Sequence, residues 1–82
     1  PWQVGKSSLL AATYPQAPRI DLLLSEEHLR YLQRPGLLRE ELADAPRGTL
    51  VVLDEIQKVP ALLDEVHWLI ENRRLVFALC GS

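Results

Sequence analysis

Residues 50–55 read LVVLDE, and this stretch is the most informative part of the sequence about the fold. Four apolar residues, two of them β-branched valines, run directly into two carboxylates, Asp54 and Glu55. Because the run from Thr49 to Leu53 is almost wholly apolar without alternation, it predicts a central parallel strand buried on both faces. Open parallel sheets bind ligands beyond the carboxyl ends of their strands, so both carboxylates are expected at a ligand-binding edge.

The segments on either side alternate between strand and helix patterns. The stretch from Ser25 has a hydroxyl that can cap a helix, and it places Leu29 and Leu32 on the inward face. Alternation of this kind predicts an α/β fold with parallel pairing and right-handed crossovers. The predicted strands cover residues 19–23, 49–53 and 75–80, and the predicted helices cover residues 6–14, 25–34, 37–43 and 60–72.

Gly5-Lys6-Ser7 is the second informative motif, and it opens the first predicted helix. A glycine lets the backbone approach a phosphate, free amides at the helix start donate to the anion, a lysine reaches the outer phosphates, and a hydroxyl ligates magnesium. The complete P-loop, or Walker A, signature is glycine, four residues, then Gly-Lys-Ser or Gly-Lys-Thr. Residues 1–4 would be those four, which places the first glycine just before Pro1.

Each motif by itself has a plainer explanation. Gly5-Lys6-Ser7 could be an exposed helix start, and Asp54-Glu55 could be a solvated turn after a core strand. Together, in this order, they favour a nucleotide site. Asp54 would then hold magnesium, usually through water, opposite Ser7, and Glu55 would polarise an attacking water.

Composition excludes several other classes of protein. The chain has 82 residues, which allows one small domain, and its net charge of -2 argues against a general nucleic-acid binder. Its single cysteine, Cys80, rules out an internal disulfide and a four-ligand zinc site, and it fits a reducing compartment. No apolar run is long enough to span a membrane, so we expect a cytoplasmic protein without a membrane partner.

The chain resembles the ATPase core of the AAA+ superfamily. It is most similar to a prokaryotic group whose cores read roughly GPRQVGKS or GPRQVGKT, then LDEIQ, then GS. The corresponding stretches here are residues 3–10, residues 53–60, which read LDEIQKVP, and residues 80–82. One departure is Trp2, which stands where arginine is usual.

The resemblance implies a three-layer P-loop NTPase fold with a parallel sheet, and ATP with Mg²⁺ as cofactors. It implies that Lys6 contacts the outer phosphates, that Ser7 and the Walker B residue Asp54 hold the metal, that Glu55 is catalytic, and that Ser82 is a γ-phosphate sensor. The implied nucleotide-binding residues are Gln3, Val4, Gly5, Lys6, Ser7 and Ser8.

Both ends of the chain suggest a piece of a longer protein. We expect residues 1–82 to be a partial AAA+ core from Walker A to the sensor strand, with a sheet that is incomplete because its first strand is missing. The expected order in space is the last strand, the Asp54 strand and the Arg19 strand, with the last strand beside the gap.

We expect the longer protein that contains this chain to bind ATP and to hydrolyse it with magnesium. This hydrolysis would be coupled to an unknown mechanical or switching task. The alternative is a nucleotide-binding or structural fragment without turnover, and we expect the 82-residue piece by itself to be inactive. The longer protein could form a homo-oligomer. We expect it to bind nucleic acid, if at all, only through a C-terminal domain that residues 1–82 do not include.

Overall fold

The computed structural model describes residues 2–4 and 13–81 of the chain. Its strands form one four-stranded parallel sheet of order β1-β4-β3-β2. The strands are β1 (Trp2–Val4), β2 (Arg19–Asp21), β3 (Leu50–Asp54) and β4 (Val76–Cys80). The helices are α2 (Ser25–Gln33), α3 (Leu37–Glu41), the 3-10 helix η1 (Ile56–Lys58) and α4 (Leu62–Arg73).

The predicted α/β class, the parallel pairing and the spatial order of β4, β3 and β2 are confirmed. The expectation of a missing first strand is wrong in one respect, because β1 fills the place beside β4 that was expected to be empty. The physical reason is that a long β4 without this neighbour would present a row of unpaired backbone groups. Gln3 and Val4, expected in the phosphate loop, therefore have strand backbone here. The helix predicted over residues 6–14 falls almost entirely on residues outside the described part.

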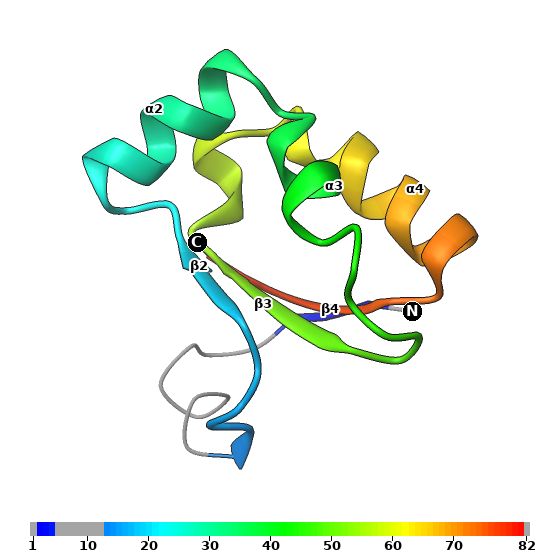
Figure 1. Ribbon diagram of the computed structural model, residues 1–82. Helices are drawn as coiled ribbons and strands as arrows, with labels where there is room; N and C mark the ends of the chain where they lie inside the picture. Colours follow the sequence, from blue (N-terminus) through cyan, green and yellow to red (C-terminus); the bar gives the residue numbers. More distant parts are fainter. Residues whose placement is uncertain (1, 5–12, 82) are drawn as a thin grey trace.

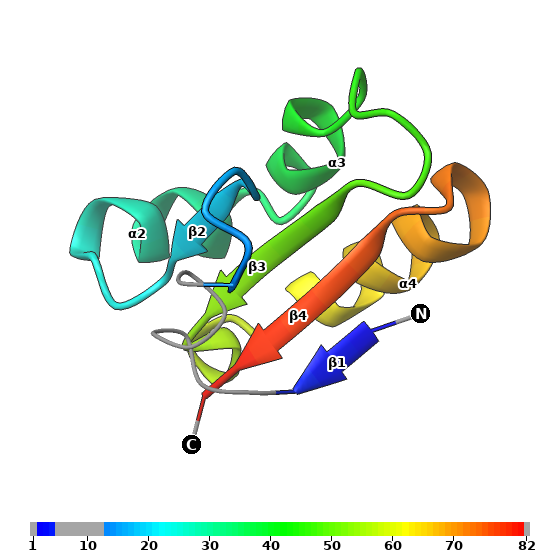
Figure 2. The ribbon, with the colours of Figure 1, turned by 90° about the horizontal axis from the view of Figure 1, so that it is seen from below.

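All the described helices cover one face of the sheet (Figures 1 and 2). Side chains alternate along a strand, so every second residue of β3 and β4 points toward them. Val51, Leu53, Phe77 and Leu79 take this direction and are buried. They pack with buried residues of the helices and connecting segments: Leu22, Tyr31, Leu38, Leu42, Val59, Leu62, Val66, Leu69 and Leu75.

The opposite face of the sheet carries a smaller apolar cluster. Val52, Ala78 and Cys80 are buried there, with Ala17 and Leu50 packed against them. Since β3 is therefore covered on both faces, the prediction of a doubly buried central strand is confirmed.

Helix α2 faces the core differently from the prediction. Leu29 and Leu32 are each 54% exposed, whereas Tyr31 is buried. The Tyr31 ring fills the space over the sheet and its hydroxyl donates a hydrogen bond to Glu41, which a leucine could not do. The expected Ser25 cap is also wrong, because the N-cap residue is Leu24 and no side chain caps the helix.

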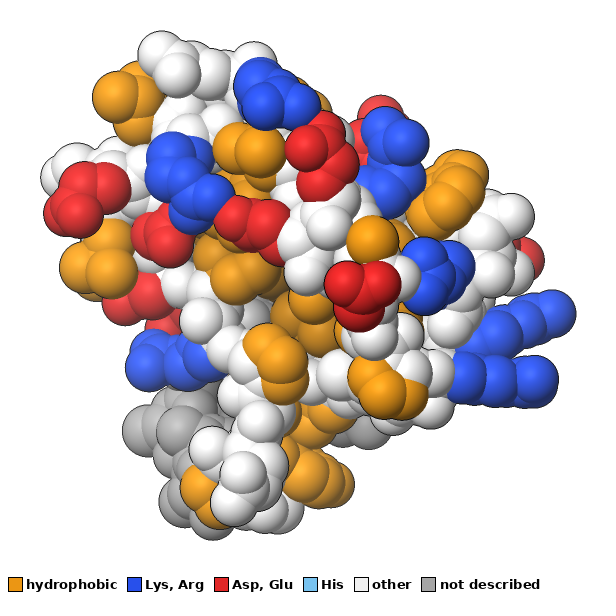
Figure 3. Space-filling model, viewed as in Figure 1, with side chains coloured by type: hydrophobic (Ala, Val, Ile, Leu, Met, Phe, Trp, Pro, Cys, Tyr) orange, Lys and Arg blue, Asp and Glu red, His pale blue; other side chains and the backbone are white. Residues whose placement is uncertain are grey.

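Charged side chains link the three helices. Arg30 of α2 contacts Glu27 on its own helix and Glu41 of α3, and Arg34 contacts Glu40. Arg39 and Glu65 join α3 to α4, and Arg39 Nε lies 3.1 Å from Glu65 Oε2. Acidic and basic side chains accordingly alternate over the helical face in Figure 3.

The contact between Tyr31, Arg30 and Glu41 predicts a pH dependence of stability. Burial raises the pKa of the Glu41 carboxyl, but hydrogen bonds from Tyr31 and Arg30 outweigh burial and leave that pKa below its usual range. A carboxyl with a lowered folded pKa stabilises the protein above its ordinary pKa of about 4.3, and this contribution is lost as the pH falls through the folded value.

We therefore expect Glu41→Gln to lower the free energy of unfolding at pH 7 by up to about 1 kcal/mol, a small value because the pair is partly exposed. The difference between parent and variant should shrink below about pH 4. Urea unfolding of the full-length protein from pH 7 to pH 3 measures it, with Glu71→Gln on α4 as the control. A difference that stays constant with pH would contradict this account.

Candidate functional site

The register of β4 brings two sequence motifs to one edge of the sheet. Leu79 of β4 is the partner of Val4 on one side and of Leu53 on the other. Since all three strands run in the same direction, Val4, the last residue of β1, lies level with Leu53, and β3 continues for one more residue to Asp54. Because β4 lies between β1 and β3, these two strands are two strand spacings apart, or about 10 Å. In the sequence, Gly5 follows Val4 and Asp54 follows Leu53.

Gly5, Lys6, Ser7 and Ser8, together with Ser82, lie outside the described residues. Gln3 and Val4 belong to β1, as described above. The geometry of the site is therefore that of Asp54 and Glu55 and the groups around them.

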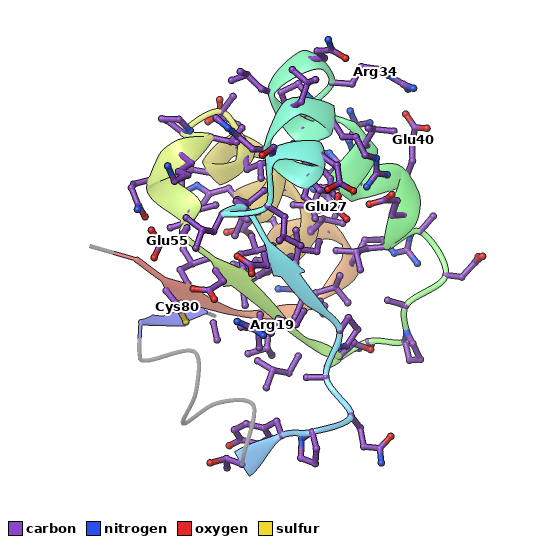
Figure 4. The ribbon with its side chains drawn as sticks, turned by 90° about the vertical axis from the view of Figure 1, so that its left-hand side faces the viewer. Arg19, Glu27, Arg34, Glu40, Glu55 and Cys80 are labelled. Atoms are coloured by element: carbon purple, nitrogen blue, oxygen red, sulfur yellow. The ribbon has the colours of Figure 1, made fainter. Side chains whose placement is uncertain are left out.

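Asp54 ends β3 as a largely buried carboxylate, with 14% of its side chain exposed. Arg19 of β2 reaches it diagonally across the two strands, and Arg19 Nη2 donates to Asp54 Oδ2 over 2.6 Å. Both side chains lie on the sheet face away from the helices, as Figure 4 shows for Arg19. The guanidinium compensates a carboxylate that would otherwise be poorly hydrated.

Asp21 is the register partner of Asp54, yet it has a different role. Its Oδ1 accepts a hydrogen bond of 3.0 Å from the Leu23 amide, which turns the chain out of β2. The Leu22 amide donates to the Asp54 carbonyl oxygen at 3.0 Å, which extends the pairing of the two strands by one bond. Asp54 is therefore held by its backbone as well as by its side chain.

Glu55 has a left-handed backbone, with φ 62° and ψ 45°. For a residue with a side chain this conformation costs roughly 1–2 kcal/mol, and such residues concentrate at functional sites. The turn leads directly into η1, where the Lys58 amide donates to the Glu55 carbonyl oxygen at 3.1 Å. The Glu55 side chain is partly exposed at the carboxyl edge, and Gln57 Nε2 donates to its Oε1 at 2.8 Å.

The described residues contribute only part of a metal site. Among residues 2–4 and 13–81, no three His, Cys, Asp or Glu side chains form a group that could hold a metal ion. Magnesium does not need such a group, because it is usually bound by one or two carboxylates, substrate phosphates and water. Asp54 fits this pattern, since its carboxylate already attracts a cationic group, the Arg19 guanidinium.

A separate pocket lies at the other end of the sheet. Its volume is about 400 Å³, and its lining includes Tyr14, Pro18, Thr49 and Leu50, at the starts of β2 and β3. No charged side chain contributes to its lining among the described residues, so it does not suit a triphosphate. The acidic carboxyl edge, although it is not enclosed, remains the candidate site.

Sequence reasoning missed two contacts of this edge, Arg19 with Asp54 and Gln57 with Glu55. A charged residue at the start of an edge strand could have suggested the first contact. No signal indicated the second, because a bond between residues two apart depends on the left-handed turn at Glu55. His28 of α2 has its Nε2 at 3.2 Å from the Lys58 carbonyl oxygen.

Comparisons with known proteins bear on what this edge does. No helix in the part of the chain that the structure describes is long and apolar enough to cross a membrane. No curated protein and no solved structure matches the chain. The profile of one protein family, described as AAA domain, matches residues 1–82. The chain therefore belongs to the AAA domain family, which indicates a nucleotide-binding, ATPase-type function for the protein that contains it.

Proposed function

We propose that the full-length protein binds ATP with magnesium and hydrolyses it at the carboxyl edge of β1, β4 and β3. One observation supports this most strongly: Val4, which precedes Gly5-Lys6-Ser7 in the sequence, and Leu53, which precedes Asp54-Glu55, share Leu79 as register partner. The proposed nucleotide-binding segment runs from Gln3 to Ser8, and residues 1–82 form the core from Walker A to the sensor strand.

The proposed roles follow from the chemistry of the side chains. Lys6 is the positive partner of the outer phosphates, and Ser82, two residues after β4 in the sequence, contacts the γ-phosphate. Ser7 and Asp54 would hold magnesium, which supplies positive charge that offsets the charge of the phosphates.

Glu55 is the proposed base for the attacking water. Its carboxylate accepts a proton from water as oxygen attacks the γ-phosphorus, the bond to the β-phosphate oxygen breaks, and ADP and phosphate leave. The left-handed turn supports this role, because it places a partly exposed carboxylate immediately beyond the buried Asp54.

Removing the Lys6 charge tests the phosphate contact. We expect Lys6→Ala to weaken binding of magnesium-ATP by roughly 10- to 100-fold, or about 1.4–2.8 kcal/mol. Calorimetry on the full-length protein measures it, and Lys58→Ala, at the exposed Lys58 of η1, is the matched control. Equal affinity in the parent and in Lys6→Ala would sink the assignment of Lys6.

The two carboxylates should differ in what they control. Asp54→Ala should impair magnesium-dependent binding and turnover together, because it removes the metal contact. Glu55→Gln should preserve binding and lower the hydrolysis rate by roughly 100-fold or more, since the amide keeps the size but not the basic oxygen. Single-turnover hydrolysis beside equilibrium binding separates the two effects, with Asp44→Ala and Glu71→Gln as controls. Hydrolysis by Glu55→Gln at the parent rate would favour a nucleotide-binding protein without turnover.

The ion pair of Arg19 with Asp54 predicts competition with the metal. We expect Arg19→Gln to lower the magnesium concentration for half-maximal ATP hydrolysis by roughly 3- to 10-fold, because the carboxylate no longer has a protein cation on it. A magnesium titration of the rate measures this, with Arg34→Gln, at an exposed pair on α2, as the control. A higher magnesium requirement in Arg19→Gln would show instead that Arg19 orients Asp54 for the metal.

A further inference from the structure

We propose that Gln57 is a positioning residue for Glu55, and that a side chain at Gly81 would displace the Gln57 amide from this contact. Gln57 would thus connect the end of β4 to the carboxylate that orients the attacking water. The inference rests on the hydrolytic role proposed above for Glu55.

The Gln57 side chain contacts the Glu55 carboxylate directly. Gln57 Nε2 donates to Glu55 Oε1 at 2.8 Å, a normal length for such a bond. The bond exists because Glu55 turns left-handed, which brings residues 55 and 57 to the same side of the chain. With Oε1 engaged by the amide, Oε2 is the oxygen left to accept a proton from water.

The Gln57 amide also fills the space beside Gly81. A Cβ added at Gly81 would lie 2.1 Å from Gln57 Oε1 and 3.1 Å from its Cδ. The shorter distance is well inside van der Waals contact, so any larger residue would displace the Gln57 amide. The two ends of this amide therefore face two different strands: Nε2 faces Glu55, which follows β3, and Oε1 faces Gly81, which follows β4.

Contacts on both sides fix the backbone of η1, the segment that carries Gln57. The Lys58 amide donates to the Glu55 carbonyl oxygen at 3.1 Å, and Val59, directly after η1, is fully buried. His28 Nε2 lies 3.2 Å from the Lys58 carbonyl oxygen and so ties η1 to α2. Because its backbone is fixed from both sides, Gln57 can hold a neighbouring carboxylate in one rotamer.

The residue type fits this role. Leucine has a similar size but no donor, and glutamate would place a second negative charge beside Glu55. The hydrogen bond to the Glu55 carboxylate and the lack of space at Gly81 favour an uncharged side chain with a donor at its end, and glutamine has both properties.

Steady-state ATP hydrolysis by the full-length protein tests the proposal. We expect Gln57→Leu to lower kcat by roughly 10- to 100-fold, the size of effect that misplacing a catalytic group produces. The KM and the affinity for magnesium-ATP should stay within about 2-fold, because Gln57 acts through Glu55 and not on the nucleotide. Gln33→Leu, the same change at an exposed position of α2, should hydrolyse at the parent rate.

A double-mutant cycle shows whether the effect passes through Glu55. In a Glu55→Gln background, Gln57→Leu should lower kcat no further, since the carboxylate that it positions is gone. Equal fold-losses in both backgrounds would overturn the proposal and leave Gln57 a merely structural residue. Parent-like turnover of Gln57→Leu, beside a slow Glu55→Gln, would overturn it too, while the proposed function would stand.

A second cycle tests the contact at Gly81 without removing the hydrogen bond directly. Gly81→Ala should lower kcat by a similar factor in the parent and should have no further effect in Gln57→Ala, where the added methyl group finds space. A loss that is the same in both backgrounds would contradict the packing argument. If Glu55→Gln itself hydrolysed ATP at the parent rate, the proposed function would fail first, and the inference with it.

Discussion

The pairing of β4 with a parallel strand on each side is the constraint on which the candidate site depends. β4 fixes the level at which β1 and β3 end, and its side chains are buried in two separate apolar clusters, one on each face. A slip by one residue would exchange these two faces, so apolar burial keeps the register in place. The register in turn places Val4 at the level of Leu53, the residue that precedes the two carboxylates.

At the carboxyl edge of the sheet, an ion pair, a strained backbone and close side-chain packing occur within a few residues of one another. The Asp54 carboxylate is compensated by Arg19, whereas Glu55 has an unfavourable backbone and an amide bound to its side chain. Strained backbone persists only where surrounding contacts fix it, and here the buried Val59 and the bonds of η1 do so. The stable helical layer thus supports two carboxylates with separate partners.

The sequence predicted the elements well because their apolar patterns are local. The buried run of β3, the position of β4 and the order of β4, β3 and β2 could all be foreseen, and so could the two carboxylates at the strand end. The inward face of α2 could not, because the contact of Tyr31 with Glu41 joins residues of two helices. The strand at residues 2–4 was missed because these residues were assigned to the phosphate loop, and the partner groups of this strand come from β4, which is distant in the sequence.

A crystal structure of full-length Glu55→Gln with magnesium-ATP would show whether the nucleotide binds at the carboxyl edge of the sheet. We expect the γ-phosphate beyond the end of β4, between the segment after β1 and Asp54, with the metal near Asp54 and the Arg19 contact of 2.6 Å lengthened or lost. Nucleotide bound elsewhere, such as in the apolar pocket beside Tyr14 at the opposite end of the sheet, would contradict it.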